Sequence, residues 1–438
     1  MFYLALEHRS GGTIRNTIDF SAPGYKLLDG YFPEAGDGMQ PISESFDIML
    51  TGASGDLIDM AREIEVILDF ARDHPNDPDG IWILYSPDET IDAWQSRLTG
   101  GALILDAKLN LRWKHEKLRA QIVIERQPFW EAIDPITLNL TNRGGTGATA
   151  NIVNHQDAGA TDDFYVEIAA DQVEGGQPAP AVVEYKNTTN NGDLVDHLMV
   201  GHFAASAPHT PPAAANLIFE GVGQSDNNCS GGSYDDLSWA DEVENQLVTW
   251  AFDPEAFRQR YYRMVARLRD TVDYIDLWLK IKLLSDTTIL SETRWTLVEA
   301  DKSLVAIGSL MIPPFKHGQY ISMDDLTLAL YEKRALGAGT MNLDFIAALP
   351  QDGWRKYEAI IGLAYNEILI DDPVNSILYT SATGGNKVTH LIEEGKPPML
   401  MPGTINLLYF LHDIDDGTAP IARTAQIAVK YHPRRRTI

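Results

Sequence analysis

Most of this chain consists of short apolar runs separated by Gly, Asn, Pro and Asp, and this pattern constrains the fold more than any other feature. After residue 160 the runs are FYVEIAA, APAVVEYKN, HLMVGHF, YYRMVARLR, DLWLKIKLL, SETRWTLVE, VAIGSLMIPP, DLTLALYEK and MNLDFIAALP. Runs of this length at this spacing are typical of β-sandwiches rather than of alternating strands and helices. We therefore expect a mainly β fold built from β-sandwich or jelly-roll modules.

The first 135 residues have a different pattern. Residues 44–50 alternate like a strand, and from Leu57 to Ala71 the apolar residues recur at helical spacing. The segment HPNDPDG at 74–80 ends the helix, because proline and glycine cannot continue it. Strands are expected again at 81–86 and 102–125. This order predicts a small α+β N-terminal domain.

Composition limits the classes of function. The chain has 438 residues, which suggests two to four domains, and a formal charge of −27 from 62 acidic and 35 basic residues. Such an acidic surface repels phosphate polyanions, so nucleic acid is not an expected partner. With Cys229 as the one cysteine, an intramolecular disulfide is impossible. We see neither a secretory signal nor a membrane-spanning run, so we expect synthesis in a cytoplasm and no membrane insertion.

Two motifs frame the β-rich part of the chain. Residues 121–131 read QIVIERQPFWE, and residues 399–410 read MLMPGTINLLYF. A strand that ends in Arg-x-Pro-aromatic-Trp-Glu, followed much later by a Pro-Gly-x-x-Asn turn into an apolar strand, resembles the distal tail proteins of long-tailed bacteriophages. The resemblance implies a ring-forming domain at 1–135 and a following β-sandwich that often carries inserted modules.

A second resemblance concerns the module that follows. YRMVARLR, WLKIKLL, a strand with Trp and Gly-x-x-x-x-Pro, and LDFI before a proline succeed one another in this order. The series resembles jelly rolls of the carbohydrate-binding-module type. We place this jelly roll at residues 140–350 and expect residues 351–438 to be the returning part of the tail sandwich into which it is inserted.

The resemblance implies a structural function. The protein would be a non-enzymatic component of a phage or prophage tail tip, located in the virion tail after synthesis in the host cytoplasm. Copies of it would close into a ring, usually of six, that joins the tail tube to hub and fibre proteins. The alternative is a carbohydrate-binding adhesin for host-surface glycans. A third hypothesis, a glycan hydrolase with a binding module, lacks a recognisable catalytic domain, because adjacent acidic pairs occur by chance among 62 acids.

The first candidate site is an interface segment where a strand leaves its sheet. Its members combine aromatic rings with an ion pair, which is the composition of an interface hot spot: Arg126, Phe129, Trp130 and Glu131. An equally good interpretation is a strand end that plugs its own core. The basic end YHPRRRTI is either a docking peptide for an acidic neighbour or a frayed terminus.

The second candidate site is the segment 203–246, which we expect to be a long surface excursion. Its oxygen-bearing residues, Asp226, Asn228, Asp235 and Asp236, are candidate ligands for a structural Ca²⁺, although a solvated loop is the better interpretation. No other cofactor is expected. Tyr234 and Trp239 lie in the same segment and are candidates for stacking on a glycan, whereas Trp278 and Trp295 are expected in the core.

Overall fold

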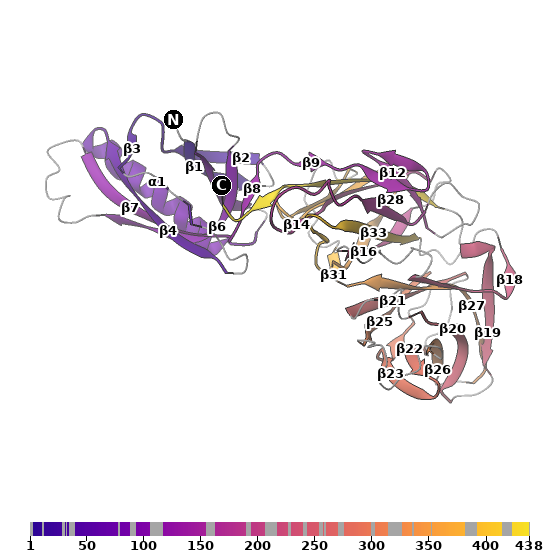
Figure 1. Cartoon of the computed structure of the whole chain (residues 1–438). Helices are drawn as coiled ribbons and strands as arrows, with labels where there is room; N and C mark the ends of the chain where they lie inside the picture. Colours follow the sequence, from indigo (N-terminus) through magenta and orange to yellow (C-terminus); the bar gives the residue numbers. More distant parts are fainter. Residues whose placement is uncertain are drawn as a thin grey trace.

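The computed structural model describes most of the chain. It covers residues 3–437 except 11–12, 29–30, 32, 35–39, 78, 88–92, 106–116, 155–162, 190–193, 206–216, 227–228, 240–242, 254–256, 258–259, 270–275, 299–302, 314–325, 335–336, 352, 382–391 and 414–422. The fold is mainly β, with antiparallel sheets and a single α-helix among these residues, as predicted. Figure 1 shows three units in a bent row, with the first unit at one end and the inserted unit at the other.

The first unit is a sheet covered on one face by the helix. Its strands follow the order β2-β1-β5-β6-β7-β4-β3, with β8 and β35 attached. The elements are β1 (Tyr3–Ser10), β2 (Thr13–Asp19), β3 (Tyr25–Leu27), β4 (Ile42–Thr51), α1 (Ser54–Asp73), β5 (Asp79–Ser86), β6 (Trp94–Leu105), β7 (Lys117–Arg126), β8 (Trp130–Ala132) and β35 (Arg434–Arg435).

Helix α1 confirms the helix predicted over 57–71. Its apolar stripe, which includes Ile64, Ile67 and Leu68, is buried against the alternate apolar positions of the sheet. The α+β character of the first unit therefore follows from two periodicities, 3.6 residues in the helix and 2 in the strands.

The second unit is a sandwich of two sheets, and it contains residues from both sides of an insertion. One sheet has the order β11-β10-β13-β33-β16-β28-β31, and the other β12-β34-β15-β29-β30 with β9 at β34. The strands are β9 (Ile136–Thr137), β10 (Leu140–Asn142), β11 (Gly145–Gly147), β12 (Ala150–Val153), β13 (Tyr165–Ile168), β14 (Ala179–Pro180), β15 (Val182–Asn187), β16 (Val195–Ala205), β28 (Arg355–Leu363), β29 (Ile368–Asp372), β30 (Ile377–Thr380), β31 (Ile392–Gly395), β32 (Met399–Leu400), β33 (Ile405–Asp413) and β34 (Thr424–Tyr431). We call this unit the host sandwich.

The third unit is a second sandwich, inserted between β16 and β28. Its sheets have the orders β18-β19-β27-β21-β25, with β17 at β27, and β20-β26-β22-β23, with β24 at β22. The strands are β17 (Ile218–Glu220), β18 (Gln224–Ser225), β19 (Ser233–Trp239), β20 (Asn245–Ala251), β21 (Arg260–Leu268), β22 (Leu277–Ser285), β23 (Thr288–Glu292), β24 (Thr296–Leu297), β25 (Leu304–Ile312), β26 (Leu326–Arg334) and β27 (Gly339–Pro350). We call it the inserted sandwich.

Strand pairing corrects the predicted boundary at residue 140. The strands between 140 and 205 pair within the host sandwich, for example β12 with β34 through Ala150 and Ile427, so they are not part of the inserted module. The insertion spans 218–350 in paired strands, and the strands from β28 to β34 return to the host sandwich, whereas β35 joins the sheet of the first unit. The predicted surface excursion at 203–246 is also wrong, because β19 pairs with β27 from Asp235 to Trp239 and Cys229 is buried.

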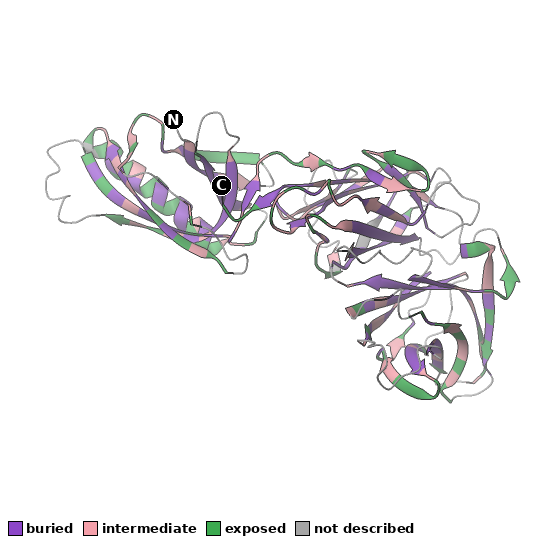
Figure 2. Ribbon diagram, viewed as in Figure 1, coloured by how far each residue is buried: buried purple, intermediate pink, exposed green. Residues whose placement is uncertain are grey.

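The two sandwiches share a continuous core. Met199, Phe203 and Tyr409 on the outer face of the host sandwich belong to the same buried cluster as Ala347 and Leu349 of the inserted one. Figure 2 shows buried positions continuing through both units, whereas β2 of the first unit is largely exposed. The inserted sandwich is therefore stacked firmly on its host rather than tethered to it.

Candidate functional site

The predicted interface segment lies inside the first unit. Arg126 and Trp130 are fully buried, and the Arg126 guanidinium lies 4.6 Å from the centre of the Trp130 ring. Arg126 also donates to the Glu44 carboxylate, which accepts the Tyr31 hydroxyl as well. Burial, and then the Glu44 charge, raise the pKa of Tyr31 well above its ordinary value. The interface prediction for Arg126 and Trp130 is corrected: the strand end plugs its own core.

The other two residues of that segment, Phe129 and Glu131, contact Arg434 near the end of the chain. Strand β35 pairs with β8, and Arg434 Nε donates to Glu131 Oε1 at 2.6 Å. The Arg434 guanidinium lies 3.8 Å from the centre of the Phe129 ring, and that of Arg435 lies 4.6 Å from the Trp94 ring. Arg434 and Arg435 are therefore not frayed, whereas Arg436 is exposed. Strand β35 completes the sheet of the chain's own first unit.

The predicted calcium ligands are not brought together. Asp226 pairs with Arg269 at 2.7 Å, and Asp235 accepts the backbone N–H of Val222 at 3.0 Å. Asp236 points the other way from Asp235, because neighbouring residues of a strand face opposite sides. Asn228 lies outside the described residues. Within the described part of the chain no three acidic, His or Cys side chains form a group able to hold a metal ion.

The predicted glycan-stacking residues offer little ring surface. Trp239 is only 6% exposed, and its indole lies against the backbone of Gly339, where an added Cβ would be 2.5 Å from Cζ2. Tyr234 is half-buried, and the Arg269 guanidinium occupies one ring face at 4.7 Å. Trp278, expected in the core, is instead 38% exposed. The alternation of LWLKIKLL, with leucine and isoleucine inward, is the signal that would have placed Trp278 outward.

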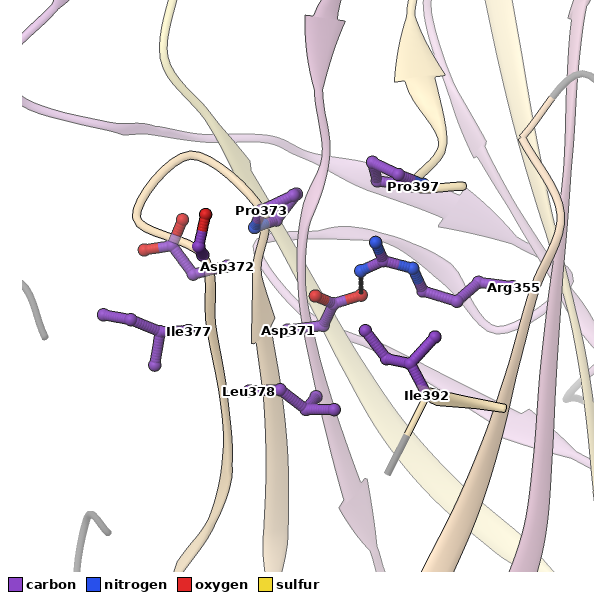
Figure 3. Close-up of a pocket in the computed structure, with 9 residues that line it drawn as sticks. Arg355, Asp371, Asp372, Pro373, Ile377, Leu378, Ile392 and Pro397 are labelled. Carbon is purple, nitrogen blue, oxygen red and sulfur yellow. Dashed lines mark hydrogen bonds and ion pairs between the residues drawn. The ribbon is translucent and has the colours of Figure 1, made fainter. Parts of the chain in front are cut away.

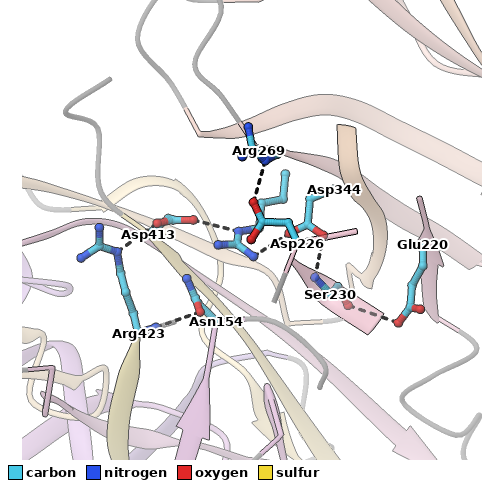
Figure 4. Close-up of polar contacts among 9 residues, drawn as sticks. Asn154, Glu220, Asp226, Ser230, Arg269, Asp344, Asp413 and Arg423 are labelled. Carbon is cyan, nitrogen blue, oxygen red and sulfur yellow. Dashed lines mark hydrogen bonds and ion pairs between the residues drawn. The ribbon is translucent and has the colours of Figure 1, made fainter. Parts of the chain in front are cut away.

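A chain of alternating buried charges joins the two sandwiches (Figure 4). Arg267 Nη1 of the inserted sandwich donates to Asp344 at 2.6 Å, and its Nε donates to Asp413 of the host sandwich at 2.9 Å. Arg423 of the host then donates to Asp413 at 3.1 Å. All four side chains are at most 1% exposed. Because two cations alternate with two anions, each charge lies beside an opposite one.

Burial shifts the titration of two groups at this joint. Desolvation raises the pKa of Asp344 to about 6, against the Arg267 charge and the Ser230 N–H, which both lower it. Desolvation also lowers the pKa of His412, next to Asp413, to about 4. His412 Nε2 lies 3.2 Å from the carbonyl oxygen of Arg423. A carbonyl oxygen only accepts hydrogen bonds, so Nε2 carries the proton of the neutral ring and donates this bond.

A cavity of about 300 Å³ opens beside the β29–β30 turn (Figure 3). Asp371 in its wall accepts hydrogen bonds from Arg355 and Tyr357, and Asp372 accepts the N–H groups of Val374 and Asn375. Each carboxylate therefore has a structural role, and the adjacent acids do not form an acid–nucleophile pair. The same turn places Val374 against a buried apolar cluster of the first unit, which contains Ala5, Trp82 and Leu84.

The sheet of the first unit ends in strands with open edges. Strand β2 is the last strand on one side, and its side chains from Thr13 to Thr17 are exposed. On the other side the short β3 pairs only with Ile48–Leu50 of the ten-residue β4. The Asp47 carbonyl of β4 accepts the Leu28 N–H at 3.0 Å, and among the described residues no strand lies along the outer edge of β4 at 42–46 or of β2. These edges present unpaired backbone groups.

Comparisons with known proteins do not identify a family for this chain. No family model and no curated protein matches the chain. The VP2 subviral particle of infectious bursal disease virus matches at 11% identity and a TM-score of 0.18, covering 68% of this chain and 78% of that one. The Gt strain structure of the same virus matches at 11% identity and a TM-score of 0.16, with 68% and 80% covered. TM-scores this low do not establish a common fold. Among the described residues, no helix is long and apolar enough to cross a bilayer.

Proposed function

We propose that this protein is a structural component of a bacteriophage or prophage tail tip. Its first unit forms a ring, of six copies by the resemblance, that joins the tail tube to the hub and fibre proteins. The observation that carries this proposal is the pair of open strand edges on opposite sides of one sheet, at β2 and at residues 42–46 of β4.

Head-to-tail pairing of these edges is the contact that such a ring needs. Strand β2 has seven residues, and the open part of β4, residues 42–46, can pair with most of it. If β2 of one copy pairs with β4 of the next, each copy uses two different surfaces, and a closing rotation produces a ring. Closure also removes the exposed edges, which otherwise invite aggregation. Helix α1 covers one face of the sheet and so lies outside the line of pairing.

The inserted sandwich fits a platform that points away from the ring. Its shared core with the host sandwich and the buried charges of Arg267 and Asp413 fix its direction. The first unit is fixed in turn, because β35 pairs with β8 and Val374 packs against Trp82. A chain whose three units are joined this firmly transmits the position of the ring to whatever the platform carries.

A pair of substitutions in β2 tests the ring contact. Phe20 N–H donates inward to Leu4, and since inward amides alternate along an antiparallel strand, the Thr17 N–H points outward. In the single copy it donates to the Asn16 side chain at 2.8 Å, and ring formation would exchange this bond for one to the next copy. Thr17→Pro removes that donor, whereas Thr17→Val keeps it in a residue of similar shape. Light scattering is expected to give several copies for wild type and Thr17→Val and the 48.6 kDa monomer for Thr17→Pro. Equal masses for both variants, with circular dichroism showing both folded, would rule out pairing through β2.

A further inference from the structure

The host sandwich contains a cavity in which two polar groups are not used by the fold. This cavity of about 300 Å³ opens between the β29–β30 turn and β31 (Figure 3). Its walls are mainly apolar and come from Pro373, Ile377, Leu378, Ile392 and Pro397. A cavity of this size and lining is at the small end of the range for pockets that hold small molecules.

A buried ion pair between the two sheets of the host sandwich lies in the wall of this cavity. Arg355 of β28 and Asp371 of β29 come from opposite sheets and are 8% and 2% exposed. Arg355 Nη1 and the Tyr357 hydroxyl both donate to Asp371 Oδ2. Among the described residues, neither Asp371 Oδ1 nor Arg355 Nη2 has a hydrogen-bond partner, and Arg355 Nε has none either. The pair therefore keeps an unused acceptor beside an unused donor.

Both unused groups face the cavity. Figure 3 shows the free terminal nitrogen of Arg355 pointing away from Asp371 toward Pro397, and the free oxygen of Asp371 pointing toward the side of Ile377. Ile377 and Pro397 both line the cavity. Polar groups in protein interiors almost always have a hydrogen-bond partner. An unused donor and an unused acceptor that open into one cavity are therefore available to water or to a ligand.

The charges around the cavity favour a neutral ligand. Arg355 and Asp371 neutralise each other. The neighbouring Asp372 carboxylate accepts three N–H groups of its own turn. An anionic ligand would lie beside two carboxylates, and a cationic ligand would lie beside the Arg355 guanidinium, so either would meet a like charge. A neutral group that has an acceptor next to a donor avoids both repulsions.

We propose that this cavity binds a small molecule that carries a primary carboxamide on an apolar body. The carboxamide oxygen accepts from Arg355 Nη2 and its N–H donates to Asp371 Oδ1, so both unused groups gain a partner. Each of these bonds involves a charged group, which makes it stronger than a bond between neutral groups. The apolar body lies against Ile377 and Ile392, where it is removed from water. This inference goes beyond the proposed function and does not rest on ring formation.

Titrations of the full-length protein with four benzene derivatives of similar size test the required hydrogen bonds. Benzamide has the donor and the acceptor, acetophenone has only the acceptor, benzoate is an anion and benzylamine is a cation. In saturation-transfer NMR, benzamide is expected to bind with a dissociation constant on the order of 1 mM, as a ligand of so few atoms can. The other three are expected to bind at least about tenfold more weakly, because each leaves Asp371 Oδ1 or Arg355 Nη2 unpaired or meets a like charge.

A substitution that fills the cavity tests its location. Ile377 is half-buried in the wall, so Ile377→Trp adds volume to the cavity, and benzamide binding is expected to weaken at least about tenfold. Ile289→Trp is the matched control, because Ile289 is 49% exposed on β23 of the inserted sandwich, and its affinity is expected to match wild type. Circular dichroism checks that both variants fold, and the four compounds on wild-type protein decide the proposal even where Ile377→Trp does not.

Four results would overturn the proposal. The first is that benzamide shows no saturable binding. The second is that acetophenone, benzoate or benzylamine binds as tightly as benzamide, which would assign the affinity to the apolar walls or to charge alone. The third is that a folded Ile377→Trp binds benzamide as wild type does. The fourth is that N-acetylglutamine methylamide binds more tightly than benzamide, which would assign the cavity to a glutamine side chain of a protein partner.

Discussion

Removal of Arg267 is the sharpest test of how the inserted sandwich is fixed to its host. Arg267 pairs with two carboxylates, that of Asp344 at 2.6 Å and that of Asp413 at 2.9 Å. The substitution Arg267→Met removes this shared cation. Asp413 keeps Arg423 at 3.1 Å, but among the residues that the structure describes Asp344 keeps only the Ser230 N–H. The variant therefore leaves one carboxylate buried without an opposite charge.

The expected cost is large for a single substitution. Removing one partner of a buried ion pair costs about 3–5 kcal/mol, because the remaining charge has no compensation, and a typical domain is stable by only about 5–15 kcal/mol. Arg269→Met is the matched control: its partner Asp226 is 2.7 Å away, yet both side chains are partly exposed, at 26% and 17%. An ion pair in that position is worth about 1 kcal/mol or less.

Urea unfolding followed by tryptophan fluorescence measures both variants, since urea adds no salt. The transition of Arg267→Met is expected at clearly lower urea than that of wild type, with Arg269→Met close to wild type. Adding Asp344→Leu to Arg267→Met removes the orphaned charge and is expected to restore part of the loss. Equal shifts in Arg267→Met and Arg269→Met, or no recovery in the double variant, would refute this explanation of the joint.

Three further predictions concern other buried groups. Because the pKa of His412 in the fold is about 4, below its ordinary 6.5, protonation between these values destabilises the fold by on the order of 3 kcal/mol, and His412→Gln is expected to lose less stability from pH 7 to pH 4.5 in urea titrations. Burial raises the pKa of Cys229 to about 12, so iodoacetamide at pH 8 is expected to label it only in urea, as mass spectrometry would show. Deleting residues 434–438 removes β35, and limited proteolysis between β8 and β9 is expected to accelerate severalfold; an unchanged cleavage rate would contradict the role of that strand.

Local sequence patterns were sufficient to predict the helix and the strands, but not which strands pair with one another. The helical spacing from Leu57 to Ala71 predicted α1, and alternation predicted the strands and the mainly β fold. The module boundary was missed because β12 pairs with β34 through Ala150 and Ile427, and nothing in either segment specifies a partner so distant in sequence.

The candidate sites show the same limit. Arg434 and Glu131 form an ion pair across 303 positions, so the basic end of the chain resembled a free tail and Glu131 resembled an interface residue. Asp226 resembled a metal ligand until Arg269 was found beside it. The predicted burial of Trp278 was wrong although the sequence contained the signal, because the alternation of its own strand places it on the outer face.

Negative-stain electron microscopy of the full-length protein, with mass by light scattering, tests the central claim most directly. We predict closed rings of several copies, with the first units in contact around the ring and the inserted sandwiches projecting from it. A 48.6 kDa monomer at every concentration, or particles held together through the inserted sandwiches, would contradict a ring built on the edges of β2 and β4.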